Sequence, residues 1–338
     1  MYIQESKKII EPASAAIVMA LGIFLLGTIE AFPLLDVYLG RFLAAILLIL
    51  WLVIYSLLTV QFFQKSFLIP FLNHPVQSFA IGTWIAGVSV LCNVFLIYFP
   101  GILKLTQLIA LINSTLWFGF IIVCLYNFTK LLTSKTRYSV HGLLLLSTVG
   151  TQSIVVLLNN VFSVSSQFTE IMIYLGILFY LMSMGLIIQS FYQQSFQSII
   201  FHWFNTNCII HGALSITGFA IVTTETFSPL IVQTLWLITF ILLVIVEMIE
   251  LLRAKQRINT FGFKQGLCVY HVSQWSRNFT FGMFYVFTFL VLENPAFSLY
   301  PNLQSHLLVI WAWVVLLALI IEVAIFSHHY LKQQKHTD

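Results

Sequence analysis

The stretch Phe42–Phe62, FLAAILLILWLVIYSLLTVQF, decides the class of fold. It holds no charged residue and is apolar almost all round, as a helix surrounded by lipid should be. The hydrocarbon core of a bilayer takes about 20 such residues per helix. The sequence therefore predicts a membrane-spanning helix here, and comparable stretches recur along the chain.

The composition extends this prediction to the whole chain. Of the 338 residues, 60% are hydrophobic and only 8% are charged, which lies outside the range of soluble domains. The polar connections are too short to form a soluble catalytic or regulatory domain. We expect an all-α polytopic membrane protein in which residues 1–338 form one integral membrane domain.

Ten stretches of the chain are about 20 residues long and predominantly apolar, so we expect ten transmembrane helices. They are expected at 12–33, 42–62, 75–98, 103–127, 141–162, 169–190, 205–224, 228–251, 272–292 and 303–327. The odd-numbered helices start about every 65 residues, a regular spacing typical of a repeat architecture. We expect five parallel helical hairpins, at approximately 12–62, 75–127, 141–190, 205–251 and 272–327.

A proline or histidine recurs just before each odd-numbered helix: Pro12, His74 with Pro75, His141, His202 and His271. They are either a feature of the repeat or an example of the preference of some side chains for helix ends at the membrane interface.

The distribution of Lys and Arg predicts the orientation. Cytoplasmic termini leave only Arg41 and Lys104 outside. The predicted cytoplasmic set is Lys7, Lys8, Lys65, Lys130, Lys135, Arg137, Arg253, Lys255, Arg257, Lys264, Lys332 and Lys335. The net charge of +4 therefore reflects topology, and no basic groove with interleaved aromatics predicts a nucleic-acid partner.

Two further features exclude other classes. The apolar run that ends near Ala31 exceeds the apolar core of a signal peptide, so we interpret it as an uncleaved first helix. The four cysteines fall singly, which predicts neither a disulfide framework nor a metal site, and no cofactor is expected.

Small and polar residues recur at helical spacing in four odd-numbered helices. Such stripes either let helices pack closely or turn toward a common axis and line a central pore in each protomer. In the second case the pore-lining residues are Ser78, Gly82, Thr148, Thr151, Gln152, Asn207, His211, Ser215, Asn278 and Tyr285.

Arg277 lies near the cytoplasmic end of the ninth predicted helix. An unpaired charge there is costly, so it should extend to the interface, pair or face water. If it flanks the inner mouth of a pore, it raises the local concentration of anions.

Five segments carry a resemblance to a known family: EPASAAIVMALGIF, HPVQSFAIGT, LSTVGTQSIVV, HGALSITGFA and WSRNFTFGMFY. In their order and helical plan they resemble the family of bacterial tellurite-resistance proteins, four-carbon dicarboxylate transporters and plant slow anion channels. The resemblance covers essentially the whole chain and implies a homotrimer with one pore per protomer, lined by the odd-numbered helices.

The resemblance also implies a phenylalanine in the ninth helix that plugs the pore. Family members often carry Phe-Pro followed by Leu or Met and Gly, whereas this chain reads Phe279-Thr280-Phe281-Gly282-Met283. Aligning Gly-Met selects Phe279, and aligning Thr-Phe selects Phe281. Because Phe281 shares a helical face with Asn278 and Tyr285, we expect Phe281 to be the gate, with Phe279 as the alternative.

The resulting hypothesis is transport of small anions across the plasma membrane, with both termini in the cytoplasm. The alternative is a proton-coupled carrier of four-carbon dicarboxylates such as malate, or an exporter of tellurite-like or sulfite-like anions, in which His211 supplies a switchable charge. An intramembrane enzyme is disfavoured because no HExxH motif or supported nucleophile is present. Most histidines lie near helix ends or in the tail, which also disfavours a haem protein.

Overall fold

A computed structural model describes residues 9–133, 138–162, 164–192 and 194–334. Within these ranges the regular secondary structure is helical, without a strand. Lys7, Lys8, Lys135, Arg137 and Lys335, which contributed to the predicted orientation, lie outside the described residues.

Eight helices in the described part of the chain are long and apolar enough to cross a membrane, so the prediction of an all-α membrane protein is confirmed. A shorter apolar helix, Pro12–Leu26, corresponds to the first predicted span, and Trp275–Glu293 corresponds to the ninth. The eight helices are Pro33–Phe62, Gln77–Tyr98, Pro100–Thr133, Gly142–Val161, Ser166–Tyr192, Asn205–Thr224, Pro229–Leu267 and Pro301–His329.

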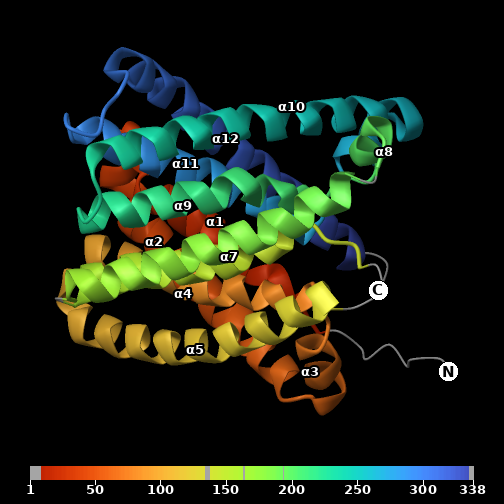
Figure 1. Cartoon of the computed structure of the whole chain (residues 1–338), viewed down its shortest axis with the longest axis horizontal. Helices are drawn as coiled ribbons and strands as arrows, with labels where there is room; N and C mark the ends of the chain where they lie inside the picture. Colours follow the sequence, from red (N-terminus) through yellow and green to blue (C-terminus); the bar gives the residue numbers. More distant parts are fainter. Residues whose placement is uncertain (1–8, 134–137, 163, 193, 335–338) are drawn as a thin grey trace.

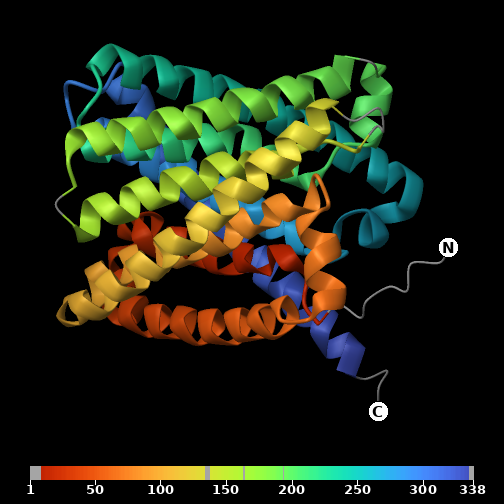
Figure 2. The same cartoon turned by 60° about the horizontal axis from the view of Figure 1, so that its bottom comes forward.

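Five inner helices contact one another in a closed ring, in the order α1, α4, α6, α9, α11 and back to α1. Each is followed along the chain by a longer helix that packs on its outer side (Figures 1 and 2). The inner helices are α1 (Ala16–Leu26), α4 (Ile81–Tyr98), α6 (Leu146–Val161), α9 (Ile209–Thr224) and α11 (Trp275–Glu293). The outer helices are α2 (Pro33–Phe62), α5 (Leu103–Thr133), α7 (Ser166–Tyr192), α10 (Pro229–Leu267) and α12 (Pro301–Gln334).

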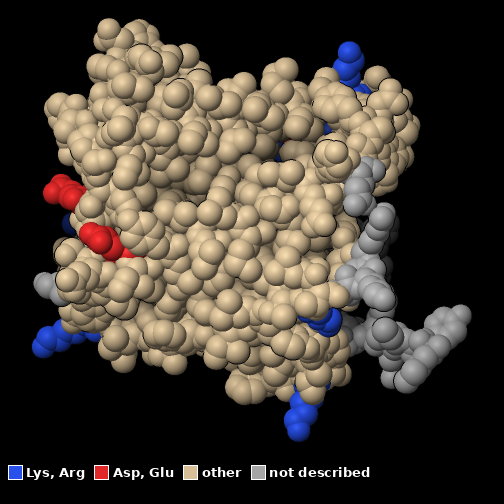
Figure 3. Space-filling view, viewed as in Figure 1, with Lys and Arg blue, Asp and Glu red and all other residues tan. Residues whose placement is uncertain are grey.

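Burial separates the two sets of helices. In the most apolar stretches of the spans containing α4, α6 and α9, 83% to 94% of the residues are buried, against 22% to 44% in the outer helices. The outer helices therefore present their apolar side chains to the surroundings. On the face seen in Figure 3, charged side chains lie at the two ends with a broad uncharged belt between them, as a lipid-embedded surface requires.

Every inner helix begins with a 3-10 turn. The turns are η1 (Pro12–Ala15), η3 (Gln77–Ala80), η5 (Gly142–Leu145), η6 (Asn205–Cys208) and η7 (Val272–Gln274). Neighbouring turns η3, η5, η6, η7 and η1 contact in that order. The five inner helices therefore run parallel, with their N-terminal ends gathered at one end of the ring.

The histidine marks of the sequence have a local explanation at these turns. Nδ1 of His74, His141 and His271 accepts hydrogen bonds from the backbone N–H groups of Val76 and Gln77, of Leu143, and of Ser273, respectively. His202 differs, since its Nδ1 bonds to Ser198 of the preceding short helix. His141 and His271 thus act as N-caps of η5 and η7, in the way that Ser or Asp often does. His74 makes a similar contact from two residues before Val76, the N-cap of η3.

Two short helices lie at the same end of the molecule. α3 (Lys65–Leu72) and α8 (Phe196–Phe201) both lie on the right in Figure 1, α8 beside the far end of α10 and α3 at the lower right. At the opposite end the turns η2 (Thr28–Ala31) and η4 (Pro100–Ile102) precede outer helices, and prolines open η4, α2, α10 and α12. Proline suits the first helical turn because its missing N–H has no intrahelical partner there.

Candidate functional site

Glycines bring the inner helices close together around the ring axis. A Cβ on Gly82 of α4 would lie 2.5 Å from the backbone oxygen of Leu146 on α6. A Cβ on Gly282 of α11 would lie 2.6 Å from Ile23 of α1. At two of its joints the ring is therefore closed by a glycine that lies directly against the neighbouring helix, and a larger residue at either position requires that neighbour to move.

The polar stripe of α6 turns outward, away from the ring axis. Thr148 Oγ1 donates to the backbone oxygen of Gly176 on α7 at 3.1 Å, and Gln152 Nε2 donates to that of Ile173 at 3.1 Å. Thr151 Oγ1 accepts from Trp117 of α5 at 3.1 Å. These three polar groups hold α6 to the two outer helices beside it, and their pore-lining role stays a prediction.

The polar groups of the α4 segment are used in the same way. Ser78 Oγ accepts from Asn127 of α5 at 3.0 Å, and Ser89 Oγ accepts from Asn113 of α5 at 3.0 Å. Gly82 closes the joint with α6, as described above. Two asparagine amides of α5 are therefore the partners of the α4 stripe.

The α9 stripe is divided among several partners. Asn207 Oδ1 accepts from the backbone N–H of Gly142 at 2.8 Å, which joins η6 to η5. Ser215 Oγ donates to the carbonyl of His211 in its own helix at 3.0 Å. The fully buried His211 points toward α10, where its Nε2 lies 3.8 Å from Oε1 of Glu247. These three residues therefore do not converge on one surface.

Arg277 is an ion-paired residue. Its guanidinium lies 3.0 Å from Oε2 of Glu250 and 3.6 Å from Oε2 of Glu247, both on α10. Glu250 also pairs with Arg253 at 3.1 Å. Of the three expectations for Arg277, pairing is the one that the described residues show, with two carboxylates of α10 beside its charge. Its role at the inner mouth of a pore stays a prediction.

Glu247 and Glu250, in the predicted span 228–251, were not expected from the sequence as partners of Arg277. A signal was available: the two acids stand three residues apart near the end of an otherwise apolar span, and residues at that spacing share a helix face. Two acids on one face opposite a lone arginine predict an interhelix ion pair.

Phe281 packs against the outer layer. Its ring lies 5.1 Å from that of Trp311 on α12 and 6.4 Å from that of His211 (ring centroids). Trp311 Nε1 also donates to the Phe281 carbonyl at 3.1 Å. Asn278 and Tyr285 share this face of α11 by helical spacing, so the stripe that selected Phe281 faces α12.

Phe279 lies on the opposite side of α11. Successive residues turn by about 100°, so Phe279 is about 200° round from Phe281. The two flanks of α11 are occupied by Gly282 against α1 and Thr280 against α9. The remaining sector faces the ring axis and carries Phe279 and Met283, which are 2% and 1% exposed. Phe279, the second candidate in the sequence, therefore lies on the axis-facing sector of α11 and Phe281 does not.

The axis-facing side of α9 is apolar as well. With His211 directed at α10 and Gly212 against Thr280 of α11, helical geometry turns Ala213 and Ala220 toward the axis. Both are fully buried. The axis is thus bordered on these two helices by alanine, methionine and phenylalanine.

Several buried polar atoms beside the ring lack a hydrogen-bond partner. They include both ring nitrogens of His211, Oε1 of Glu247 and Nε of Arg277. Separations of 3.6–3.8 Å between these side chains are too long for a direct hydrogen bond and within the range of an ion pair. No group of three or more His, Cys, Asp or Glu side chains in the described ranges is placed to hold a metal ion.

Two comparisons with known proteins identify no relative of this chain. A scan against protein-family models gives no match, and a search of curated proteins gives no significant match.

Proposed function

We propose that this protein moves small anions across the membrane along the axis of the five inner helices. In this proposal ten helices cross the bilayer as five parallel hairpins, with the short α1 and α11 as the first and ninth spans. The observation that carries it is the closed ring of parallel inner helices, whose N-terminal turns meet at one end.

The parallel arrangement gives the axis an electrostatic polarity. Each helix carries roughly half a positive elementary charge at its N-terminus, from the free N–H groups and aligned peptide dipoles. Five such ends at one mouth favour an anion over a cation there, without any free basic side chain. This supports an anionic solute even though Arg277 is paired with glutamates.

Phe279 is the proposed gate. Its ring is buried and lies on the sector of α11 that faces the axis, beside Met283. An apolar constriction of this kind opposes the passage of hydrated ions because it offers nothing to replace their water shell. Opening requires the Phe279 ring to move aside.

Flux measurements in vesicles test this assignment. We expect Phe279→Ala to raise passive flux of chloride, nitrate, sulfite or malate at least about tenfold, following the membrane potential. Phe281→Ala is the matched control, since it removes a similar ring from the outward face and should leave the flux near the wild-type value. Equal increases in the two variants, or no increase in a folded Phe279→Ala protein, would contradict the gate assignment.

A proton-coupled carrier of four-carbon dicarboxylates is the second candidate, and His211 with Glu247 favours it. Ionisable side chains within membrane spans often form proton relays. Transfer of a proton between the imidazole and the carboxylate, which lie 3.8 Å apart, would couple uptake to the proton gradient. An exporter of tellurite-like or sulfite-like anions would use the same axis.

Glu247→Gln distinguishes the carrier from the passive path. It keeps the shape of the side chain and leaves Glu250 to pair with Arg277. In a carrier, malate uptake that saturates and depends on an imposed proton gradient should lose that dependence in the variant. Gradient-dependent uptake that persists unchanged would remove His211 and Glu247 from the mechanism.

From the family resemblance we further propose that the protein is a homotrimer in the plasma membrane. Both of its termini are proposed to lie in the cytoplasm. Lys65 on α3 and the basic residues at the far end of α10 lie at one end of the molecule, whereas Arg41 and Lys104 lie near the other ends of α2 and α5. This asymmetry supports the orientation. Light scattering of the detergent-solubilised protein tests the trimer, and a monomeric mass would contradict it.

A further inference from the structure

The far end of α10 extends beyond what a membrane span needs. Its continuous helical part ends at Gly262, where the backbone turns to φ 76° and ψ 166°. From Pro229 to that point the helix is about 50 Å long at 1.5 Å per residue, against about 30 Å of hydrocarbon. The last turns therefore lie at or beyond the membrane boundary.

This extension is basic. Between residues 251 and 267 the chain carries Arg253, Lys255, Arg257 and Lys264 and no acidic residue. Arg253 is held by Glu250 and by Asn205 Oδ1 at 2.5 Å. Within the described part of the chain, Lys255, Arg257 and Lys264 form no ion pair, so their charges remain available to a partner.

Exposed aromatic side chains stand next to these charges. Phe261 is 54% exposed beside the turn at Gly262, and Phe201 at the end of α8 is 58% exposed. α8 packs against α10 here, as Figure 1 shows at the upper right. Aromatic rings combined with Lys and Arg at this depth are typical of elements that lie in the interface between water and lipid.

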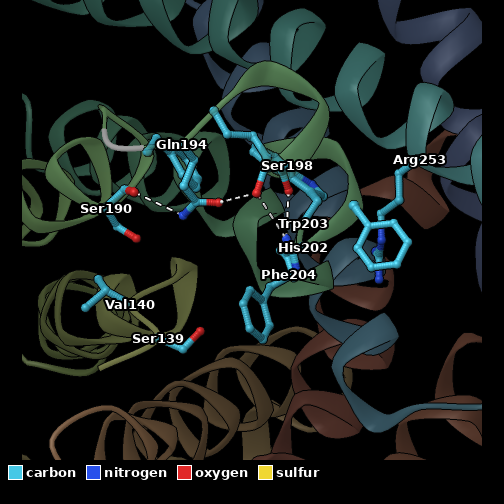
Figure 4. A pocket seen from close by; sticks show the side chains of 12 residues that line it. Ser139, Val140, Ser190, Gln194, Ser198, His202, Trp203, Phe204 and Arg253 are labelled. Atoms are coloured by element: carbon cyan, nitrogen blue, oxygen red, sulfur yellow. Dashed lines mark hydrogen bonds between the residues drawn. The ribbon is translucent and has the colours of Figure 1, made fainter. Parts of the chain in front are cut away.

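Cavities flank α8 on this surface. One of about 530 Å³ is bordered by Ser139, Ser198, His202, Phe204 and Arg253, and Figure 4 shows these side chains around it. A second, of about 200 Å³, is lined by Phe201, Phe261, Arg253, Arg257 and Thr260. A third, of about 490 Å³, includes Lys255 and Thr260. Each combines cationic and hydroxyl groups with apolar walls.

We propose that this α8–α10 surface, formed by Phe201, Arg253, Lys255, Arg257, Phe261 and Lys264, binds the headgroups of anionic phospholipids. Guanidinium and ammonium groups donate to the phosphate, and the exposed rings lie against the start of the acyl chains. Each basic residue near an anionic surface contributes about 1 kcal/mol, which corresponds to roughly fivefold in affinity. The charge complementarity and the position at the membrane boundary favour a lipid over a soluble partner.

Lipid retention by the purified full-length protein tests the proposal. In micelles titrated with phosphatidylglycerol or phosphatidylcholine, native mass spectrometry should find phosphatidylglycerol bound at least about tenfold more tightly. Lys255→Gln with Arg257→Gln should lower that affinity roughly twentyfold and leave phosphatidylcholine binding unchanged. Arg41→Gln with Lys104→Gln, at the other end of the molecule, is the matched control and should leave both affinities unchanged.

Three results would overturn the proposal: equal binding of the two lipids, an unchanged preference in the Lys255/Arg257 variant, or inorganic phosphate displacing the lipid at equal concentration. The last result would assign the surface to a soluble anion. If the double variant does not fold, the exposed Lys264→Gln, with an expected loss of about fivefold, provides the same comparison. The readout is independent of transport.

Discussion

The outward and axis-facing sides of the inner helices differ in polarity, and the polar side is the outward one. The outward faces carry the hydroxyls, amides and charges, including Thr148, Gln152, His211 and Arg277, each directed at an outer helix. The axis-facing sectors of α9 and α11 carry Ala213, Phe279 and Met283. A polar stripe on a membrane helix therefore marks where its partner helix lies, and an apolar stripe borders the axis.

The difference follows from what each face must satisfy. Outer-helix backbones expose carbonyls such as those of Gly176 and Ile173, and a donor from α6 binds each of them at 3.1 Å. In hydrocarbon the alternative for such polar groups is to remain unpaired, so interhelix hydrogen bonds form readily. A closed gate has the opposite requirement, because groups that replace an ion's hydration would let it through.

The largest effect is expected at the outward ion pair. Arg277→Met leaves Glu247 and Glu250 without their partner on α11 and should destabilise the fold by about 3–5 kcal/mol. Adding Glu247→Gln restores the charge balance, since Glu250 keeps Arg253, and should recover most of the loss. Thermal unfolding in detergent measures both variants. Equal stability of Arg277→Met and wild type would mean that Arg277 faces water.

The next effect concerns closure of the ring. In Gly82→Ala the new methyl group meets the Leu146 backbone, which cannot rotate away, so we expect a loss of about 1–3 kcal/mol. Gly119→Ala is the control, because nothing lies within 4 Å of its Cβ position and alanine is the better helix former. A Gly82→Ala protein as stable as the control would show that α4 and α6 are not in contact there.

The end of the ring should respond to pH through His141. Burial, with a smaller effect from neighbouring His74, lowers the pKa of His141 to about 4, below the value of about 6.5 in an unfolded chain. The unfolded state therefore takes up a proton first as pH falls, and stability decreases from about pH 6.5 toward pH 4, by up to about 2 kcal/mol at pH 5. His141→Asn should reduce this decrease. An identical pH profile in the variant would contradict the assignment.

The smallest effect is expected for single outward hydroxyls. Thr148→Val removes the hydrogen bond to Gly176 and should cost about 1 kcal/mol while leaving anion selectivity unchanged. Selectivity measured in vesicles, together with the unfolding temperature, checks this. A changed selectivity with unchanged stability would return Thr148 to the lining of the path and would weaken the distinction between the two faces.

That this is a membrane protein could be predicted from the sequence, because the prediction depends on the hydropathy summed over segments of about 20 residues. The stretch Phe42–Phe62, interrupted only by Ser56, Thr59 and Gln61, is long and apolar enough to span the hydrocarbon core. The regular starts of the odd-numbered helices were equally visible, since the capping histidines and prolines stand next to them.

The direction of a stripe could not be predicted, because it depends on pairing between helices. Periodicity places Phe281, Asn278 and Tyr285 on one face but does not tell which neighbour that face meets. Trp311, which settles the question for Phe281, lies 30 residues away on α12. The partners of Arg277 likewise lie on α10, and only the packed structure brings them within 3.6 Å.

The joint between α1 and α11 has a consequence for biogenesis. Ile23 meets Gly282, so the first inner helix has no permanent neighbour on one side until the last hairpin has been synthesised. At 5–20 residues per second the intervening chain takes roughly 10–50 s to make, during which the flank of α1 is available to lipid or to insertion factors. Truncation before α11 should therefore leave an open arc of helices that is prone to degradation, however complete its other four hairpins are.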